Sequence, residues 1–216
     1  MFRNKRTFND ELQTAYAKQF KRYGATPEGS YWFSKTRQNL RFEIMIQEVI
    51  KLHGNLDLYI GDIGCGYGAL AEYIAKMHYS KWVRYCGYDI SKPLIDFCHK
   101  TYDYSWAEFV IGSKPLSAVD ICMLSGTFNL AVTKNALDWE NHIFNNLTKC
   151  WIYTKKTLIF NLQTSEISHI SDGNIFYANK IKVLNRCKAL FGPSFIVEHE
   201  KLPFDTTFII PKNNIG

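Results

Sequence analysis

The sequence predicts an α/β protein with a mostly parallel sheet. From residue 56 onward, short apolar runs alternate with amphipathic stretches, which is the pattern of successive β-α-β units. A glycine-rich turn follows the first apolar run and precedes a helical stretch. Near the C-terminus, the apolar runs 195–200 and 206–210 are separated by only five residues. Strands so close must pair as an antiparallel hairpin, so the sheet is expected to contain one antiparallel strand.

The N-terminal part is predicted to be helical. Apolar residues recur at helical spacing over residues 8–23, and glycine and proline then break the chain. A second helix is expected over residues 34–53, before Gly54. Residues 1–55 are therefore expected to form a helical cover within the same domain as a core of residues 56–216.

The core is predicted to alternate strands and helices. Short apolar runs bounded by turn residues predict five strands before the hairpin, at 58–63, 83–90, 108–111, 119–124 and 157–162. The stretches between and after them carry helical patterns, at 69–78, 91–101, 138–150 and 181–190. A core of this size needs no cross-link to be stable.

Composition narrows the range of partners. The net charge is +6, but the basic residues are dispersed, with small clusters at Arg3, Lys5, Arg6 and at Lys18, Lys21, Arg22. A nucleic-acid binder concentrates charge in one stripe, so a solvated surface is the preferred interpretation. None of the six cysteines forms a CxxC pair, and we expect no metal site. Free cysteines, a polar N-terminus and no apolar run of about 20 residues predict a cytoplasmic protein without a membrane segment.

The strongest chemical signal is the turn at residues 62–68, which reads DIGCGYG. It lies directly between a predicted strand and a predicted helix. Gly64 allows the tight turn, Gly66 lets a ligand approach the backbone, and Gly68 lets the helix pack on the sheet. The N–H groups at the helix start are expected to face a ligand crevice.

Asp89 is the second anchor of the predicted site. It ends the second strand, about 20 residues after Gly68. A carboxylate there can accept both hydroxyls of a ribose. The alternative, a carboxylate that only caps the next helix, is less favoured because the glycine turn is adjacent.

The nucleoside is predicted to carry a positive charge. A dinucleotide site would read G-x-G-x-x-G, whereas here the third glycine comes one residue early. Asp62 also precedes the turn, and a carboxylate there repels a pyrophosphate. The same carboxylate favours S-adenosylmethionine, which carries a sulfonium and an ammonium group.

The segment DIGCGYG, followed by YDIS at residues 88–91, resembles the first two motifs of class I S-adenosylmethionine-dependent methyltransferases. The order of predicted elements over residues 56–212, about three quarters of the chain, is similar too. The resemblance implies a single doubly wound, seven-stranded sheet whose last-but-one strand in space is antiparallel. It also implies S-adenosyl-L-methionine as the cofactor.

The resemblance further implies which residues hold that cofactor. Asp62 and the backbone of residues 64–68, including Cys65, would hold the methionine part, Asp89 the ribose, and Ile90 the adenine. The family often has an acid after the third strand; here Ser113 or a backbone group is expected to replace it. Trp32 would fold over the cofactor, and Arg37 or Arg41 would meet its carboxylate. An equally favoured alternative is that the two N-terminal helices only pack on the sheet.

Catalytic candidates follow the fourth and fifth strands. Ser125, Gly126, Thr127, Phe128 and Asn129 come directly after the fourth strand, where open α/β sheets bind ligands. Of these, Ser125 and Gly126 are expected to contact the cofactor, and Ser125 and Asn129 to act at the methyl group. His169, in a long predicted loop over residues 163–173, is a candidate base, although a solvated loop histidine is more common.

A methyltransferase acting on a small-molecule acceptor is the preferred function. The chain lacks an Asn/Asp-Pro-Pro-aromatic box after the fourth strand, which disfavours nucleic-acid amines, and it has no Pro-Cys nucleophile. A protein or nucleic-acid acceptor, or a non-catalytic nucleoside-binding module, remain alternatives. A nicotinamide enzyme is disfavoured by the glycine spacing and by the lack of a Tyr-x-x-x-Lys pair. The acceptor and the oligomeric state are not encoded in any recognised motif.

Overall fold

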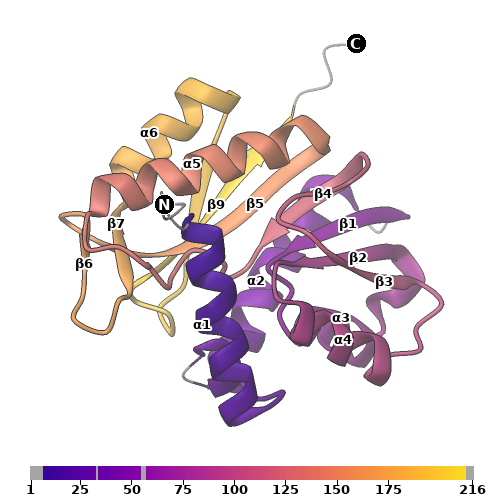
Figure 1. Ribbon diagram of the computed structural model, residues 1–216. Coiled ribbons are helices and arrows are strands. Elements are labelled where there is room, and N and C mark those ends of the chain that lie inside the picture. The colour runs from indigo at the N-terminus through magenta and orange to yellow at the C-terminus, as the bar shows by residue number, and fades with distance from the viewer. Residues whose placement is uncertain (1–6, 33, 55–56, 213–216) are drawn as a thin grey trace.

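The computed structural model describes residues 7–32, 34–54 and 57–212. Within them, a nine-stranded sheet forms the centre of the protein (Figure 1). Five strands lie side by side in the order β3-β2-β1-β4-β5 and run parallel. Their bounds are β1 Leu58–Ile63, β2 Val83–Asp89, β3 Ala107–Ile111, β4 Val119–Leu124 and β5 Thr154–Ser165. Each contains the apolar run that predicted it, with boundaries shifted by three residues or fewer.

The C-terminal hairpin completes the sheet. β9 (Asp205–Pro211) pairs antiparallel with β5, and β8 (Phe195–Glu198) pairs antiparallel with β9. These two strands and the five parallel ones make the expected seven, with the antiparallel strand last but one. The predicted doubly wound, mostly parallel fold is therefore confirmed.

Two further strands extend the sheet beyond these seven and correct the prediction of a long loop over residues 163–173. β7 (Phe176–Asn179) pairs parallel with the end of β5, and β6 (His169–Ile170) pairs antiparallel with β7. The end of β5 is polar in sequence, so no apolar run announced it. Backbone pairing with β7 forms its ladder, and the hydroxyls of Thr164 and Thr206 bond at 2.9 Å.

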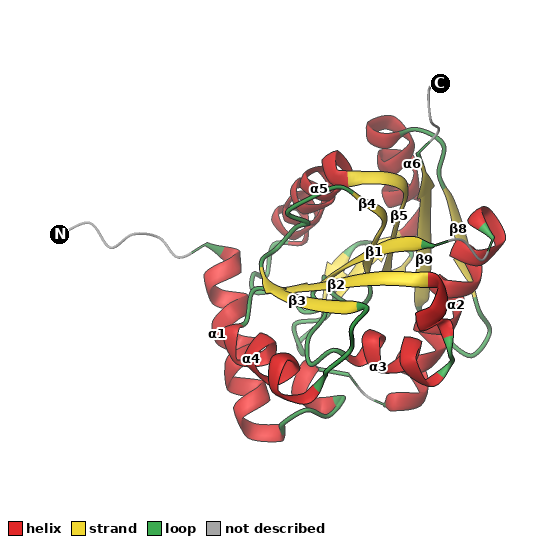
Figure 2. Ribbon diagram, turned by 90° about the vertical axis from the view of Figure 1, so that its right-hand side faces the viewer, coloured by secondary structure: helices red, strands yellow, loops and turns green. Residues whose placement is uncertain are grey.

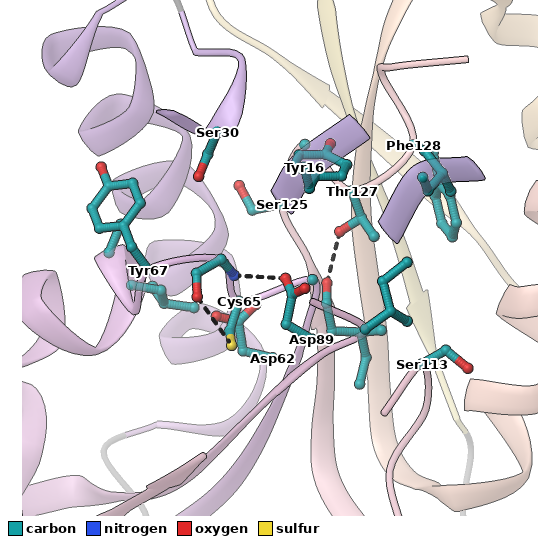
Figure 3. A pocket seen from close by; sticks show the side chains of 18 of the residues that line it. Tyr16, Ser30, Asp62, Cys65, Tyr67, Asp89, Ser113, Ser125, Thr127 and Phe128 are labelled. Atoms are coloured by element: carbon teal, nitrogen blue, oxygen red, sulfur yellow. Dashed lines mark hydrogen bonds between the residues drawn. The ribbon is translucent and has the colours of Figure 1, made fainter. Parts of the chain in front are cut away.

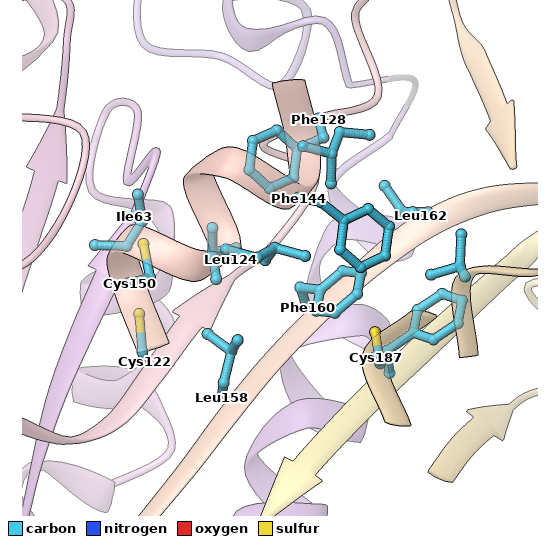
Figure 4. Packing of buried hydrophobic residues seen from close by; sticks show 14 of the residues in the cluster. Ile63, Cys122, Leu124, Phe128, Phe144, Cys150, Leu158, Phe160, Leu162 and Cys187 are labelled. Carbon is cyan, nitrogen blue, oxygen red and sulfur yellow. The ribbon is translucent and has the colours of Figure 1, made fainter. Parts of the chain in front are cut away.

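Helices cover both faces of the sheet (Figure 2). α5 and α6 pack on one face, and α2, α3 and α4 pack on the other. Side chains alternate accordingly along β4, where Cys122 and Leu124 belong to the first core and Ile121 and Met123 to the second. Figure 4 shows the first core, in which Leu124 and Phe160 of the sheet meet Phe144 of α5. The bounds are α2 Lys35–His53, α3 Ala69–Lys76, α4 Lys92–Thr101, α5 Ala136–Tyr153 and α6 Lys180–Phe191.

α1 (Phe8–Tyr23) connects the two helical layers. Its first residue, Phe8, packs on Trp139 of α5 with ring centroids 5.6 Å apart, and Phe20 packs on Phe97 of α4 at 5.7 Å. Between them, the Gln13 side chain donates a hydrogen bond of 2.9 Å to the carbonyl of Ile90, just beyond β2. The helix thus crosses the carboxyl edge of the parallel strands, as a helical cover should.

Some predictions fall on residues outside this description. The cluster Arg3, Lys5 and Arg6 and the boundary between residues 55 and 56 lie there, so the division at residue 55 stays a prediction. Among the helices that are described, none is both long enough and apolar enough to cross a bilayer.

Candidate functional site

A cavity lies at the carboxyl edge of the parallel strands (Figure 3). It encloses about 910 Å³, counting the part that opens to solvent, and its walls come from the ends of β1, β2 and β4 and from α1, α2 and α5. The glycine turn lines it, and α1 contributes Leu12 and Tyr16 to the lining. This is the edge at which open α/β sheets bind ligands.

The glycine turn has the backbone that its sequence predicts. Gly64 and Gly68 have φ angles of 76° and 82°, a left-handed conformation that favours glycine. A Cβ on Gly64 would lie 2.7 Å from the side chain of Thr127, and one on Gly68 would lie 2.5 Å from the ring of Tyr102. A larger residue would clash at both positions. Glycine therefore lets the turn before α3 lie close to Thr127 and Tyr102.

Asp89 links the tip of β2 to this turn. One carboxylate oxygen accepts a hydrogen bond of 3.0 Å from the N–H of Gly66, and the other accepts one of 2.8 Å from the N–H of Ser91. Burial raises the pKa of Asp89 to about 6, although both hydrogen bonds act to lower it. A carboxylate has about four acceptor positions, so each oxygen retains one for a further donor. Two neighbouring hydroxyls match that capacity.

Asp62 is the second buried carboxylate of the cavity. It accepts a hydrogen bond of 2.6 Å from the hydroxyl of Tyr85. Burial raises its pKa to about 7, and the nearby charge of Asp89 adds to that rise, while the Tyr85 hydroxyl opposes it. A bound cation would favour the ionised form of both carboxyl groups.

Two serine hydroxyls at the cavity lack a partner. The oxygens of Ser30 and Ser125 are buried, and neither makes a hydrogen bond within the described residues. Both residues line the cavity (Figure 3). Because buried polar atoms in native proteins are nearly always satisfied, these two hydroxyls indicate a polar ligand.

The structure brings most of the predicted cofactor residues to this cavity. Its lining includes Trp32, Asp62, Gly64, Cys65, Gly66, Asp89, Ile90, Ser113, Ser125 and Gly126. Gly68 does not line the cavity; it shapes the turn instead. The individual roles assigned to these residues stay predictions.

Four predicted residues lie elsewhere. Asn129, Arg37 and Arg41 line a second, adjacent cavity. His169 is exposed on β6, where it stacks on Tyr177, and it lines neither cavity. Its position in the pairing of β6 with β7 leaves the proposed base role without geometric support.

Arg41 already has a carboxylate partner within the protein, whereas the sequence led us to expect a contact with the carboxylate of the cofactor. Its guanidinium forms a buried ion pair with Asp205 and lies 4.5 Å from the ring centroid of Trp32. Asp205 also accepts hydrogen bonds from Asn161 at 2.9 Å and Gln163 at 3.2 Å. Burial lowers the pKa of Arg41 and raises that of Asp205, and the attraction between the two groups opposes both shifts.

Sequence reasoning missed several lining residues, among them Tyr16 of α1 and His142 and Asn146 of α5. Tyr16 belongs to an apolar stripe that was assigned to packing. His142 and Asn146 are four residues apart, and the Asn146 amide donates a hydrogen bond of 2.8 Å to the carbonyl of His142. Their i, i+4 spacing puts both on one face of a helix, a signal that could have grouped them.

Comparisons with known proteins agree with this geometry. No protein-family model matches the chain. A Mycobacterium tuberculosis protein that carries the name of a methyltransferase is 25% identical over 156 residues, covering 71% of this chain and 92% of its own. Magnesium protoporphyrin IX methyltransferase from Synechocystis, solved with bound S-adenosylmethionine, superimposes with a TM-score of 0.70 at 9% identity, covering 98% of this chain and all of its own.

Two further solved structures share the architecture. A Leishmania major S-adenosylmethionine-dependent methyltransferase gives a TM-score of 0.69 at 13% identity, over 96% of this chain and 87% of its own. The plantazolicin methyltransferase BpumL gives a TM-score of 0.61 at 13% identity, over 95% of this chain and 98% of its own. The chain has the class I S-adenosylmethionine-dependent methyltransferase fold. Within this methyltransferase fold, the strand pair β6–β7 is an addition to the seven strands that the sequence predicted.

The Arg41–Asp205 pair yields a stability prediction. Asp205→Ala leaves the buried guanidinium of Arg41 without its charge partner, so the free energy of unfolding should fall by about 3–5 kcal/mol. Urea denaturation followed by circular dichroism measures this loss. The double variant Arg41→Met/Asp205→Leu removes both charges and should lose less. A single variant as stable as the wild type, or a double variant less stable than the single one, would contradict this account.

Proposed function

We propose that this chain is an S-adenosylmethionine-dependent methyltransferase that acts on a small-molecule acceptor. The observation that carries the proposal is the pair of buried carboxylates, Asp62 and Asp89, on either side of a glycine turn at the edge of the sheet. The fold, the motif resemblance and the methyltransferase name of the Mycobacterium relative support the same activity. The cavity lies at the carboxyl ends of β1, β2 and β4, where open α/β sheets bind nucleoside ligands.

The residues of the cavity fit S-adenosylmethionine in chemical type. Asp89 offers two acceptor positions to the ribose hydroxyls, and Ile90 and Ser113 offer an apolar face and a hydroxyl to the adenine. Asp62 and the backbone of residues 64–68 offer a negative charge and polar groups to the methionine part. Ser30 and Ser125 offer hydroxyls that lack partners among the described residues.

The cofactor supplies a reactive methyl group, so the protein has to supply position and electrostatics. Leu12 and Tyr16 of α1 line the cavity, bring no charged group of their own and add apolar surface to it. Asp62 and Asp89 are buried, so their charges act on a bound cation more strongly than they would in water. Ser125 and Asn129, which follow β4, are our candidates for orienting the acceptor. A general base is needed only if the acceptor must lose a proton.

A small molecule is the preferred acceptor because the second cavity adjoins the first. Both are lined by Tyr16, Ser30, Trp32 and Gly126, so there is space for a second small molecule beside the cofactor. Two structural neighbours are named for the compounds magnesium protoporphyrin IX and plantazolicin. Another structural neighbour was solved in complex with the methyltransferase activator Trm112, so binding of a protein partner should be tested as well.

We also propose that the protein works in a reducing compartment, the cytoplasm. All six cysteines are buried and free. Free buried thiols are common where glutathione and thioredoxin keep them reduced. Their packing as small apolar residues, as at Cys122 and Cys150 in Figure 4, needs no oxidation.

The role of Asp89 gives the first test of the proposed function. Asp89→Ala removes the acceptor of both ribose hydroxyls and frees the N–H of Gly66, so affinity for S-adenosylmethionine should fall by more than about tenfold. Isothermal titration calorimetry with S-adenosylmethionine, S-adenosylhomocysteine and NAD measures this on wild type and variant. The matched control is Asp96→Ala, an exposed acid on α4 that pairs with Lys92. Tight binding of NAD with no binding of the other two would refute the proposal.

The raised pKa values of the two carboxyl groups give a pH prediction. Burial puts the pKa of Asp62 at about 7 and that of Asp89 at about 6, above their ordinary 3.8. In the free protein these groups stabilise the fold at low pH, and that contribution is lost as pH rises through the folded values. Binding of a cationic ligand needs the ionised forms, so its affinity should rise over the same window.

We therefore expect the affinity for S-adenosylmethionine to strengthen by about tenfold or more between pH 5 and pH 8. Calorimetry across this range measures it, and the increase in Tm caused by the ligand should grow in parallel. Asp62→Asn cannot ionise and should show a weaker dependence on pH. An affinity that does not change with pH in the wild type would contradict the electrostatic account.

A further inference from the structure

The second cavity lies beside the cofactor cavity and has a different character. It encloses about 750 Å³, including the part open to solvent. One of its walls is the shared set of Tyr16, Ser30, Trp32 and Gly126. A molecule bound here would meet the cofactor cavity across Gly126, directly after β4. If the proposed function holds, this is the place for the methyl acceptor.

Aromatic side chains form much of this cavity. Tyr31 and Trp32 come from the segment before α2, Tyr177 comes from β7, and Phe204 comes from the turn before β9. Tyr177 is held in place by His169, whose ring stacks on it with centroids 5.0 Å apart and planes 6° apart. Phe204 is partly open to solvent, so its ring can be reached by a molecule that enters the cavity. Walls of this kind suit a flat, aromatic molecule.

The charged groups of the cavity leave one positive charge unbalanced. Arg37 and Arg41 line the cavity, and the only carboxylate that pairs with either of them, within the described chain, is Asp205. Arg41 balances the charge of that carboxylate, which also accepts hydrogen bonds from the Asn161 and Gln163 amides. Arg37 has no ion-pair partner among the described residues, so the pocket presents a net charge of about +1.

The position of Arg37 on α2 makes this charge costly without a ligand. The first turn of α2 contains Lys35 and Arg37 and no acid. Cations at a helix N-terminus are unfavourable because the helix dipole is positive there. Lys35 is compensated by Glu72, at 3.0 Å, but Arg37 is not. An anion bound beside Arg37 would relieve the repulsion.

A second, independent observation points to the same ligand. The Nε of Arg41 is buried and makes no hydrogen bond within the described residues, although the side chain is only 6% exposed. A buried donor on a guanidinium without an acceptor is rare and costs free energy. Arg41 lines the same cavity as Arg37. Both arginines therefore bring N–H donors to the wall of this cavity.

We propose that the second cavity binds the methyl acceptor, and that this acceptor is a small aromatic molecule with an anionic group such as a carboxylate. The anion lies against Arg37, with the Nε of Arg41 as a further donor. The ring lies between Trp32 and Tyr177. The end of the molecule away from the anion faces Gly126 and the cofactor cavity.

Calorimetry on the protein saturated with S-adenosylhomocysteine tests this proposal. The probes are aromatic acids and their uncharged amides, matched in size: salicylate with salicylamide, and indole-3-acetate with indole-3-acetamide. In at least one pair the acid should bind about tenfold more tightly than the amide, since an ion pair and a charge-assisted hydrogen bond are lost with the charge. Arg37→Gln should abolish that preference, and Arg37→Lys should keep much of it.

Arg84→Gln is the matched control. The side chain of Arg84 is 65% exposed and lies at the start of β2, at the opposite end of the strand from the cavities. Its substitution should leave the preference for the acid unchanged. Equal binding of acids and amides, or a preference that survives Arg37→Gln, overturns the proposal. So does an Arg37→Gln variant that loses tenfold in affinity for S-adenosylhomocysteine, since Arg37 would then serve the cofactor. Failure of the wild type to bind S-adenosylhomocysteine at all would instead refute the methyltransferase function.

Discussion

Two carboxylates, Asp62 and Asp89, are buried at the edge of the sheet, and neither has an ion-pair partner in the described part of the chain. Burying such groups costs free energy, which is why burial raises their pKa values. The protein tolerates this cost by supplying hydrogen bonds from Tyr85, Gly66 and Ser91. A bound cation would lower it further, so the geometry of the free protein is already arranged for a positively charged ligand.

The rest of the fold serves to place these groups. The left-handed glycines let the turn after β1 pass close to Asp89, and α1 extends from α5 to α4 across the same edge. The hairpin β8–β9 brings Asp205 under Arg41, and the added strands β6 and β7 bring Tyr177 beside them. One edge of the sheet thereby carries two adjoining cavities, one with buried acids and one with a surplus cation. In the function that we propose, that opposition of charge would separate a cationic methyl donor from an anionic acceptor.

Much of this could be predicted from the sequence because its signals are local. Apolar periodicity located the helices and the strands of the core, and the spacing of Gly64, Gly66, Gly68 and Asp89 located the turn. The features that sequence reasoning missed depend on contacts between distant residues. Arg41 and Asp205 meet only when α2 packs against the start of β9, and no sequence pattern near either residue predicts this ion pair.

The strands β6 and β7 were missed because they are very short. β7 spans four residues and buries Phe176 and Ala178, and it pairs with the end of β5, while the two residues of β6 pair with β7. Tyr16 lies in a helical stripe in which a core residue and a ligand-contacting residue look alike. Its place at the cavity follows from where α1 crosses the sheet, which the pattern of one helix does not contain.

A crystal structure of the protein grown with S-adenosylhomocysteine tests the central claim most directly. The account predicts that the adenosine lies over the glycine turn with both ribose hydroxyls on the carboxylate of Asp89, and that the serine hydroxyls of Ser30 and Ser125 gain polar partners. A ribose bound away from Asp89, or a cavity that side chains fill while the ligand lies elsewhere, would contradict it.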